Sequence, residues 1–245
     1  MYKVILPADF ISLQKEKCHF FRKCHFFVIK FRNIALFIIN LNKEKDSMIL
    51  ERLKTETRPY HDRIEEVGFS NQIMSGQLTL DEYKMLVINN YRMHKLVEGK
   101  MAQMPEVTAL EGLDFESRKK TALLAKDLTD LGLNPDDYTT EGMNIDLSDF
   151  HKAMGVYYVL EGSTLGGSVI ARKLATNPNL ANEGLTDFNF YGCYGDMVGP
   201  RWKAFQQVLL NVATDTAAED KMVAGASAAF ETMTEMFIAA RAAKA

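Results

Sequence analysis

From Met48 onward, apolar side chains recur every three or four residues, which is the spacing of one face of an α-helix. The first such segment ends at Gly68. Pro59 lies inside this segment and should bend or restart the helix just before His61. No segment alternates convincingly between apolar and polar residues, so a sheet is not expected.

Start and stop signals divide the rest of the chain into further helices. The run from Thr79 to Glu82 is a capping box and opens a long helix. Asp114 is expected to cap a helix that closes at Gly132. Three more helices are expected, over about 150–175, from about 199 to 209, and over about 217–242. The pattern therefore predicts an all-α, compact multi-helix fold.

The composition agrees with one helical domain. The chain has 245 residues, 47% of them hydrophobic and only 6 of them proline, so it can bury one sizeable core. The formal net charge of −3 gives no reason to expect a nucleic-acid partner.

Residues 1–47 differ from the rest of the chain in charge and in cysteine content. They hold nine basic and four acidic residues, a net charge of +5, whereas the 20 basic and 28 acidic residues that follow give a net charge of −8. Cys18 and Cys24 also lie in this segment, which leaves Cys193 as a single cysteine in the main body. A single cysteine cannot build a disulfide framework, so we expect a reducing, cytoplasmic setting.

The N-terminal segment lacks the marks of a targeting or membrane sequence. Its apolar stretch at 28–41 is shorter than the roughly 20 residues of a spanning helix. The acidic main body gives no reason to expect membrane attachment, and the N-terminal segment leaves that question open. Its two Cys-His pairs could hold a metal, but they lack the usual zinc spacing. We interpret 1–47 as an extension outside the fold and 48–245 as the folded domain.

The first candidate site surrounds His61. A neutral imidazole is a good iron ligand, and Glu65 follows one helical turn later, where its carboxylate can accept the other ring proton. Lys54 precedes His61 by two turns and could meet an anionic group beside the metal. A surface histidine in a row of ion pairs would give the same pattern, and this alternative stays open.

The second candidate site is a glycine-rich stretch within the helix expected over 150–175. Glycine in a helix is less favourable than alanine by about 1 kcal/mol, so Gly162, Gly166 and Gly167 call for a reason. Gly162 and Gly166 are four residues apart and bare one stripe of backbone, against which a flat macrocycle could lie. The gap would admit dioxygen, and Ser163 could order water. A close crossing of two helices explains the glycines equally well.

Together, the two sites suggest the two faces of a haem sandwich. Arg201 and Lys203 add positive charge that could hold the haem propionates, or they form a solvated basic face. We interpret His94 as a structural histidine in the middle of a helix and His151 as a solvated one in a first turn.

Two stretches of the chain resemble the haem oxygenase family. Two motifs are similar to the proximal segment of that family. The first is Thr-x5-His-x3-Glu, which ends at Glu65, and the second is Gly-Gln-Leu-Thr-x3-Tyr, which ends at Tyr83. The stretch Tyr-Val-Leu-Glu-Gly-Ser-Thr-Leu-Gly-Gly, which ends at Gly167, resembles the distal helix of the bacterial branch. The likeness spans about residues 48–215.

The resemblance implies an all-α haem-oxygenase-like fold in which haem is both substrate and cofactor. The expected reaction opens the ring at a meso carbon and gives biliverdin, carbon monoxide and ferrous iron, with a reductase or a ferredoxin-type partner as electron donor. Ser163 stands where the animal branch places a distal aspartate, which leaves the group that delivers protons open. The resemblance assigns these roles: His61 as the proximal iron ligand, Glu65 as its hydrogen-bond partner, Gly162, Ser163, Gly166 and Gly167 over the oxygen site, Lys54 and one of Tyr157 or Tyr158 at the propionates, and, more loosely, Arg201 and Lys203.

Other hypotheses share parts of this pattern. A non-enzymatic haem carrier needs the same His61 and differs only in whether bound haem survives oxygen and reductant. Relatives of this fold without haem use a Glu-x-x-His pair for two iron ions, which does not occur after Met48, or a cysteine nucleophile. Cys193 lies in a glycine-flanked turn instead. A purely structural bundle would leave the paired motifs as coincidence.

Overall fold

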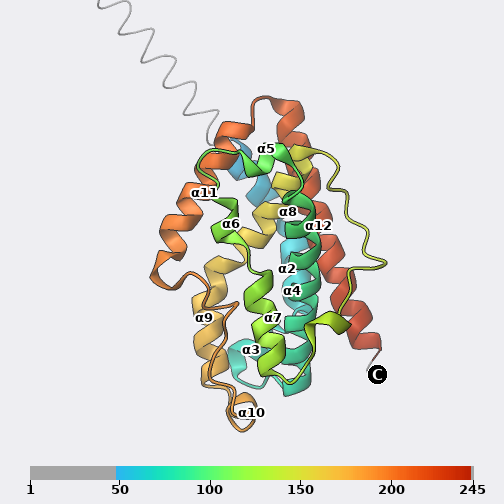
Figure 1. The fold of residues 1–245 in the computed structure, drawn as a ribbon, viewed down its shortest axis with the longest axis vertical. Helices are drawn as coiled ribbons and strands as arrows, with labels where there is room; N and C mark the ends of the chain where they lie inside the picture. Colours follow the sequence, from blue (N-terminus) through green and yellow to red (C-terminus); the bar gives the residue numbers. More distant parts are fainter. Residues whose placement is uncertain (1–47, 244–245) are drawn as a thin grey trace, which may run out of the picture. The chain divides into compact units, whose positions relative to one another are not determined.

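The computed structural model describes residues 48–243, and the expectations for 1–47 lie outside them. Every regular element among the described residues is helical, which confirms the all-α prediction (Figure 1). Residues 48–56 form a first helical segment. The other elements in chain order are α2 (Arg58–Val67), α3 (Ser70–Ser75), α4 (Leu80–Met101), α5 (Pro105–Thr108), α6 (Phe115–Arg118), α7 (Thr121–Asp130), η1 (Pro135–Asp137), α8 (Phe150–Gly162), α9 (Thr164–Ala175), α10 (Pro178–Ala181), η2 (Gly195–Met197), α11 (Val198–Val212) and α12 (Thr216–Ala242).

Local sequence signals set several helix starts as expected. The Thr79 hydroxyl accepts the N–H of Glu82 at 3.2 Å, and the Glu82 carboxylate accepts the N–H of Thr79 at 2.8 Å, so the capping box opens α4. The Asp149 carboxylate caps the first turn of α8. Pro59 is the second residue of α2, which begins directly after a turn, so the helix restarts before His61 as expected.

The single helix expected over 150–175 is wrong, because the chain breaks at Ser163 between α8 and α9. The Ser163 hydroxyl donates to the carbonyl of Leu160 at 2.7 Å, and the Thr164 hydroxyl donates to that of Glu161 at 2.7 Å. Hydroxyl groups that compete for helix carbonyls beside a glycine are a known cause of kinks. The break therefore places Gly162 at the end of one helix and the other two glycines in the next.

The helix expected from Asp114 to Gly132 is also interrupted. Asp114 has a left-handed backbone, with φ of 49°, and its carboxylate does not cap the helix. The extended backbone of Lys119 separates α6 from α7. This bend brings Arg118 and Lys120 into the interior, where both bind the buried carboxylate of Glu161 on α8. A long-range ion cluster therefore overrides the local helical pattern.

The crossing of α8 and α12 depends on two glycines that the sequence analysis did not single out. A Cβ atom on Gly155 would lie 1.9 Å from the carbonyl oxygen of Met222, and one on Gly225 would lie 2.1 Å from that of Lys152. No larger residue fits at either position without moving the helices apart. The small-residue helix crossing therefore occurs here.

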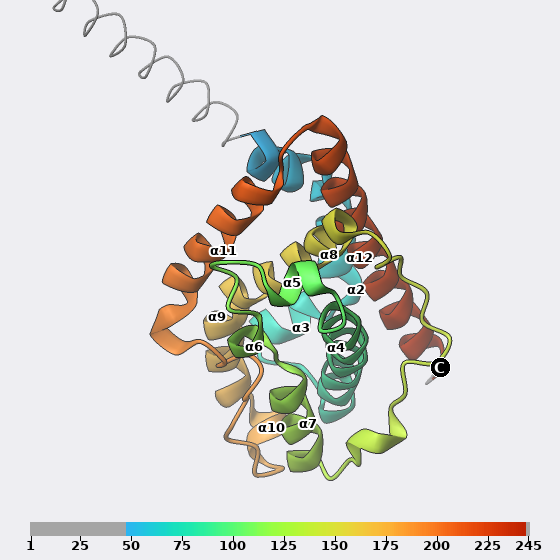
Figure 2. The ribbon, with the colours of Figure 1, turned by 45° about the horizontal axis from the view of Figure 1, so that its top comes forward.

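The buried apolar side chains form two clusters. One gathers side chains of α8, α11 and α12, and the other gathers side chains of α3, α4 and α7. Ile64 on α2 and Met233 on α12 pack against both clusters, so the clusters meet between these helices. In Figure 2, α8 lies in the middle, with α9 and α11 on one side of it and α12 on its other side.

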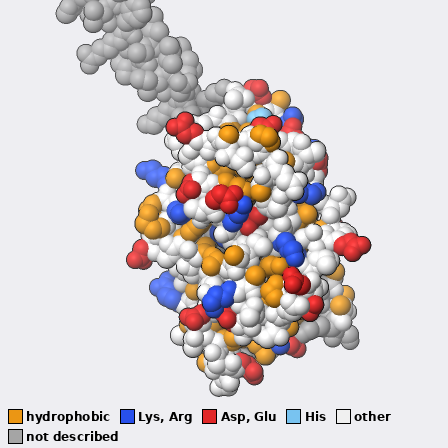
Figure 3. All heavy atoms as spheres, in the orientation of Figure 1, with side chains coloured by type: hydrophobic (Ala, Val, Ile, Leu, Met, Phe, Trp, Pro, Cys, Tyr) orange, Lys and Arg blue, Asp and Glu red, His pale blue; other side chains and the backbone are white. Residues whose placement is uncertain are grey.

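The surface of the described residues shows mixed chemistry. On the face drawn in Figure 3, basic, acidic and hydrophobic side chains are interspersed. Among the described helices, none is both long enough and apolar enough to cross a membrane.

Candidate functional site

A cavity of about 420 Å³ lies where the two hydrophobic clusters meet. Its volume is in the range of sites that bind small molecules and cofactors. Most of its lining is apolar, and six helices of ten or more residues contribute to it. The lining residues are His61, Ile64, Glu65, Gly68 and Ser70 from α2 and the start of α3; Leu86, Asn90, Met93 and His94 from α4; Tyr158, Val159, Leu160, Gly162, Ser163, Leu165, Gly166 and Ile170 from α8 and α9; Phe190 and Tyr191; Trp202 from α11; and Phe230, Met233 and Phe237 from α12.

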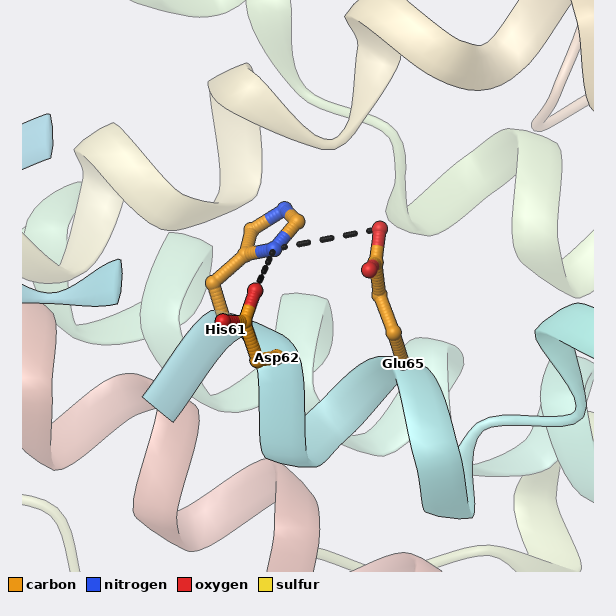
Figure 4. Close-up of side chains that lie close together, drawn as sticks. All are labelled: His61, Asp62 and Glu65. Carbon is orange, nitrogen blue, oxygen red and sulfur yellow. Dashed lines mark ion pairs between the residues drawn. The ribbon is translucent and has the colours of Figure 1, made fainter. Parts of the chain in front are cut away.

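His61 presents an accessible imidazole to this cavity. Its side chain is 47% exposed, and the ring meets the edge of the Phe230 ring at a centroid distance of 5.7 Å. The Nδ1 atom lies 3.8 Å from a Glu65 carboxylate oxygen and 3.9 Å from one of Asp62, and all three side chains project from the same side of α2 (Figure 4). Both distances are too long for hydrogen bonds. The expected carboxylate is therefore adjacent to the ring without being bonded to it, and Asp62 is a second one.

Gly162 and Gly166 both line the cavity, and their missing side chains leave open space. A Cβ atom on Gly162 would lie 3.6 Å from the Trp202 ring, and one on Gly166 would meet only Ile170 of its own helix at 3.8 Å. Both are ordinary contact distances, so packing within the described residues does not require glycine at either position. Gly167 differs, because its Cβ would lie 2.6 Å from the carbonyl oxygen of Tyr191. The helix-crossing explanation therefore does not hold for Gly162 and Gly166.

His94 is buried, as expected for a structural histidine, and it also lines the cavity. Its Nδ1 atom lies 2.8 Å from the Glu98 carboxylate, which also accepts backbone N–H groups of Lys120 and Thr121. Burial alone would raise the pKa of Glu98, but hydrogen bonds from His94, Thr121 and Lys120 lower it to about 2. Burial lowers the pKa of His94. Because an ionised carboxylate only accepts, Nδ1 of the neutral ring carries the proton and Nε2 is left as an acceptor.

His151 lies in the first turn of α8, as expected, but it is half-buried against Phe150 and not fully solvated. It does not line the cavity.

Of the two candidate tyrosines, the structure brings Tyr158 to the cavity and leaves Tyr157 in the core. Consecutive helical residues point about 100° apart, and here Tyr158 faces the cavity whereas Tyr157 faces the core. Tyr157 is fully buried between Phe115 and Phe205, and among the described residues its hydroxyl has no hydrogen-bond partner. Burial raises the pKa of Tyr158, so its hydroxyl stays protonated and can donate.

The basic residues expected near the propionates do not line the cavity. Lys54 and Lys203 are exposed. The guanidinium of Arg201 donates to the Ser117 hydroxyl at 2.8 Å and lies 4.9 Å from the centre of the Tyr194 ring. Arg201 is therefore engaged with α6 and the segment before α11.

Comparison with known proteins decides the family. The protein-family model described as heme oxygenase matches residues 47–239. The chain belongs to the haem oxygenase family. The heme oxygenase of Xanthomonas campestris pv. campestris is 30% identical over 156 residues, which cover 63% of this chain and 88% of that protein. Heme oxygenase 1 of a Nostoc species is 24% identical over 203 residues, which cover 78% of this chain and 85% of that protein.

Solved haem oxygenase structures share this fold, as the sequence predicts. The heme oxygenase of Neisseria meningitidis, solved with NO and with CO bound, matches with a TM-score of 0.59 and 24% identity over 78% of this chain and 91% of that chain. Heme oxygenase-1 of Synechocystis, solved in complex with haem, matches with a TM-score of 0.62 and 20% identity over the same shares.

The cavity has the donor set that a haem group needs. An accessible imidazole is a suitable ligand for haem iron, and Gly162 and Gly166 leave a bare strip of backbone in the same cavity. The remaining lining is mainly apolar, which suits a flat macrocycle. The residues present therefore fit haem.

Several residues that line the cavity were not predicted from the sequence. Phe190 and Tyr191 lie in an irregular stretch, where no periodic pattern indicates which side chains face inward. Phe230 belongs to a run of apolar residues in α12 that gives no sign of a cavity. Asn90, one turn before His94, could have been found, because a polar residue on a buried helix face is a recognisable signal.

Proposed function

We propose that this protein is an active haem oxygenase, which opens haem to biliverdin and releases carbon monoxide and ferrous iron. The observation that carries the proposal is one cavity lined both by an accessible histidine, His61, and by two glycines, Gly162 and Gly166, that packing does not require. When bound, haem supplies the oxygen chemistry itself, and the protein supplies binding, orientation and proton delivery.

His61 is the proposed iron ligand. Its ring is accessible, and Glu65 and Asp62 stand beside Nδ1, where a small side-chain rotation allows one of them to accept the ring proton. A carboxylate in this position orients the imidazole and raises its basicity.

Gly162 and Gly166 are the proposed backing for the face of the ring on which oxygen reacts. Any side chain there would fill the space that the ring and dioxygen need. The Ser163 hydroxyl is occupied as a donor to Leu160, so it can serve only as an acceptor for ordered water. The free Nε2 of His94 is a second acceptor for ordered water in the same cavity.

The haem propionates need polar or basic partners at the edge of the cavity. Tyr158 is the proposed contact from the cavity lining, through its protonated hydroxyl. Lys54, Arg201 and Lys203 lie outside the lining and can act only from its surroundings. The reaction consumes electrons, so a reductase or a ferredoxin-type protein is the proposed partner.

The test is to add ferric haem to the full chain and follow the visible spectrum under air with ascorbate. The proposal expects the Soret band to decay while a biliverdin band grows. Haem that binds but survives would indicate a carrier, and a protein that does not bind haem would contradict both functions.

Gly166→Leu provides a sharper version of this test. The added side chain projects into the space proposed for the ring and oxygen, so turnover should fall by more than about tenfold while haem affinity changes less. The matched control is Gly99→Leu, which adds the same side chain to an exposed helical position with open space around it. Equal losses of turnover and affinity in Gly166→Leu would contradict the role given to the glycines.

A further inference from the structure

Asp127 on α7 is a buried carboxylate without a counter-ion. Its side chain is 2% exposed, and no basic group among the described residues forms an ion pair with it. Its hydrogen-bond partners all come from one short stretch: the N–H of Asn189 at 2.8 Å, the side-chain amide of Asn189 at 2.7 Å and the N–H of Phe190 at 2.9 Å. Burial raises the pKa of Asp127, against the lowering effect of the hydrogen bonds from Asn189 and Phe190.

The stretch that Asp127 holds forms part of the cavity wall. Phe190 and Tyr191 both line the cavity, although neither belongs to a helix. The Phe190 ring meets the His94 ring edge-on at 5.3 Å and the Tyr191 ring at 5.0 Å. On its other side, the carbonyl of Tyr191 lies against Gly167 of α9. An irregular segment of the wall is thus fixed at two points, by Asp127 and by the close approach to Gly167.

We propose that Asp127 is a positioning residue for the haem reaction, because it holds Phe190 and Tyr191 as a rigid wall that limits how the ring can rotate in the cavity. It touches no bound group itself and acts only through these two aromatic side chains. The proposal explains why an acidic residue stands at a buried site that offers it no cation. The part that concerns the product rests on the proposed function.

The first measurement needs no haem. In Asp127→Asn the amide keeps one acceptor oxygen, and its NH₂ group faces a backbone N–H, so at least one of the two backbone bonds is lost. Amide hydrogen exchange in the ligand-free full chain should then accelerate by about tenfold or more at Phe190 or at Asn189, whichever N–H loses its acceptor. Unchanged exchange at both residues would overturn the proposal.

Asp130→Asn is the matched control. It makes the same chemical change three residues further along α7, where the carboxylate is 33% exposed and meets only side chains, those of Lys126 and Asn189. Its exchange at Phe190 should match that of the unmodified protein.

The second measurement uses ferric haem. For Asp127→Asn we expect haem to bind about tenfold more weakly and ascorbate-driven degradation to give a mixture of biliverdin isomers, whereas Asp130→Asn gives the wild-type product. If the unmodified protein binds haem without degrading it, the proposed function fails, and the exchange and affinity measurements still decide the role of Asp127. The role of Asp127 is overturned if Asp127→Asn binds haem with wild-type affinity and, where the enzyme is active, gives the wild-type pattern of biliverdin isomers.

Should Asp127→Asn fail to fold, Asn189→Ala takes its place. This variant removes one of the three donors and leaves both backbone N–H groups bonded to Asp127. It should accelerate exchange at Phe190 by a smaller factor, and no acceleration would count against the proposal.

Discussion

Two helices of this protein carry a histidine followed four residues later by a glutamate, and the two pairs have opposite surroundings. On α2, the ring of His61 is half-exposed, and Glu65 stands 3.8 Å from its Nδ1 atom. On α4, His94 and Glu98 are both buried, and the corresponding distance is 2.8 Å. Both histidines line the same cavity.

The same spacing of a histidine and a glutamate serves a different role in each of the two pairs. Glu98 also accepts backbone N–H groups of Lys120 and Thr121, so its pair with His94 joins α4 to the start of α7 and cannot rearrange freely. Glu65 has no such contacts among the described residues, and the pair on α2 is free to adapt to a ligand. A buried, fully bonded pair supports structure, whereas an accessible, loosely paired one suits a metal ligand.

The first way to test this contrast is His61→Ala, for which we expect the largest effect. Loss of the proposed iron ligand should weaken haem binding by more than about a hundredfold, because even the loss of a supporting hydrogen bond to such a ligand costs 10- to 100-fold. The free energy of unfolding should change by less than about 0.5 kcal/mol, since the ring is half-exposed. Haem titration and urea unfolding measure the two quantities.

His151→Ala is the control for His61→Ala, because His151 is a half-buried histidine outside the cavity. It should bind haem as the unmodified protein does. A His61→Ala protein that binds haem with nearly full affinity would place the iron ligand elsewhere.

Glu98→Gln tests the buried pair. The amide NH₂ group would face N–H donors, which leaves buried polar groups without partners, and we expect unfolding to become easier by about 2 kcal/mol. Glu65→Gln, at the same spacing on α2, should change the free energy of unfolding by less than about 0.5 kcal/mol. Urea denaturation of both variants checks the difference, and equal stabilities would remove the distinction between the pairs.

The buried pair also predicts a pH dependence. The pKa of Glu98 is lowered from 4.5 to about 2 in the folded protein, so its stabilising contribution is complete above about pH 4.5 and is lost as the pH falls toward 2. The stability difference between the unmodified protein and Glu98→Gln should therefore shrink over this range. A difference that stays constant between pH 5 and about pH 2.5 would contradict the lowered pKa.

The sequence predicts those parts of the site that depend on local signals. Pro59 marks the restart of the helix before His61, and the capping box at Thr79 places α4. The break at Ser163 also has local causes, in a hydroxyl group next to a glycine, but its position depends in addition on Glu161, which binds partners more than 40 residues away in the chain. Long-range partners of this kind leave no mark in a single sequence.

The glycines show the same limit more clearly. One helical stretch of the sequence contains four glycines, which the sequence alone does not tell apart: Gly155, Gly162, Gly166 and Gly167. Only the neighbours in space distinguish them, because Gly155 meets a backbone carbonyl of α12, Gly167 meets one of Tyr191, and the other two face the cavity. The sequence therefore predicts that close approach matters in this stretch, but it does not indicate what approaches.

Glu65→Gln is the variant with the smallest expected effect on haem binding. It tests whether the pair of His61 and Glu65 on α2 can be replaced by another partner of the histidine. The Nδ1 atom of His61 is 3.8 Å from Glu65 and 3.9 Å from Asp62, so either carboxylate can turn to accept the ring proton when a ligand binds Nε2. Loss of one should weaken haem binding by less than about tenfold, because the other substitutes, whereas Glu65→Gln combined with Asp62→Asn should exceed the sum of the two single losses in free energy. Haem titrations of the three variants measure this coupling. Additive losses would mean that the two carboxylates do not substitute for each other, and the pair on α2 would then be less adaptable than its distances indicate.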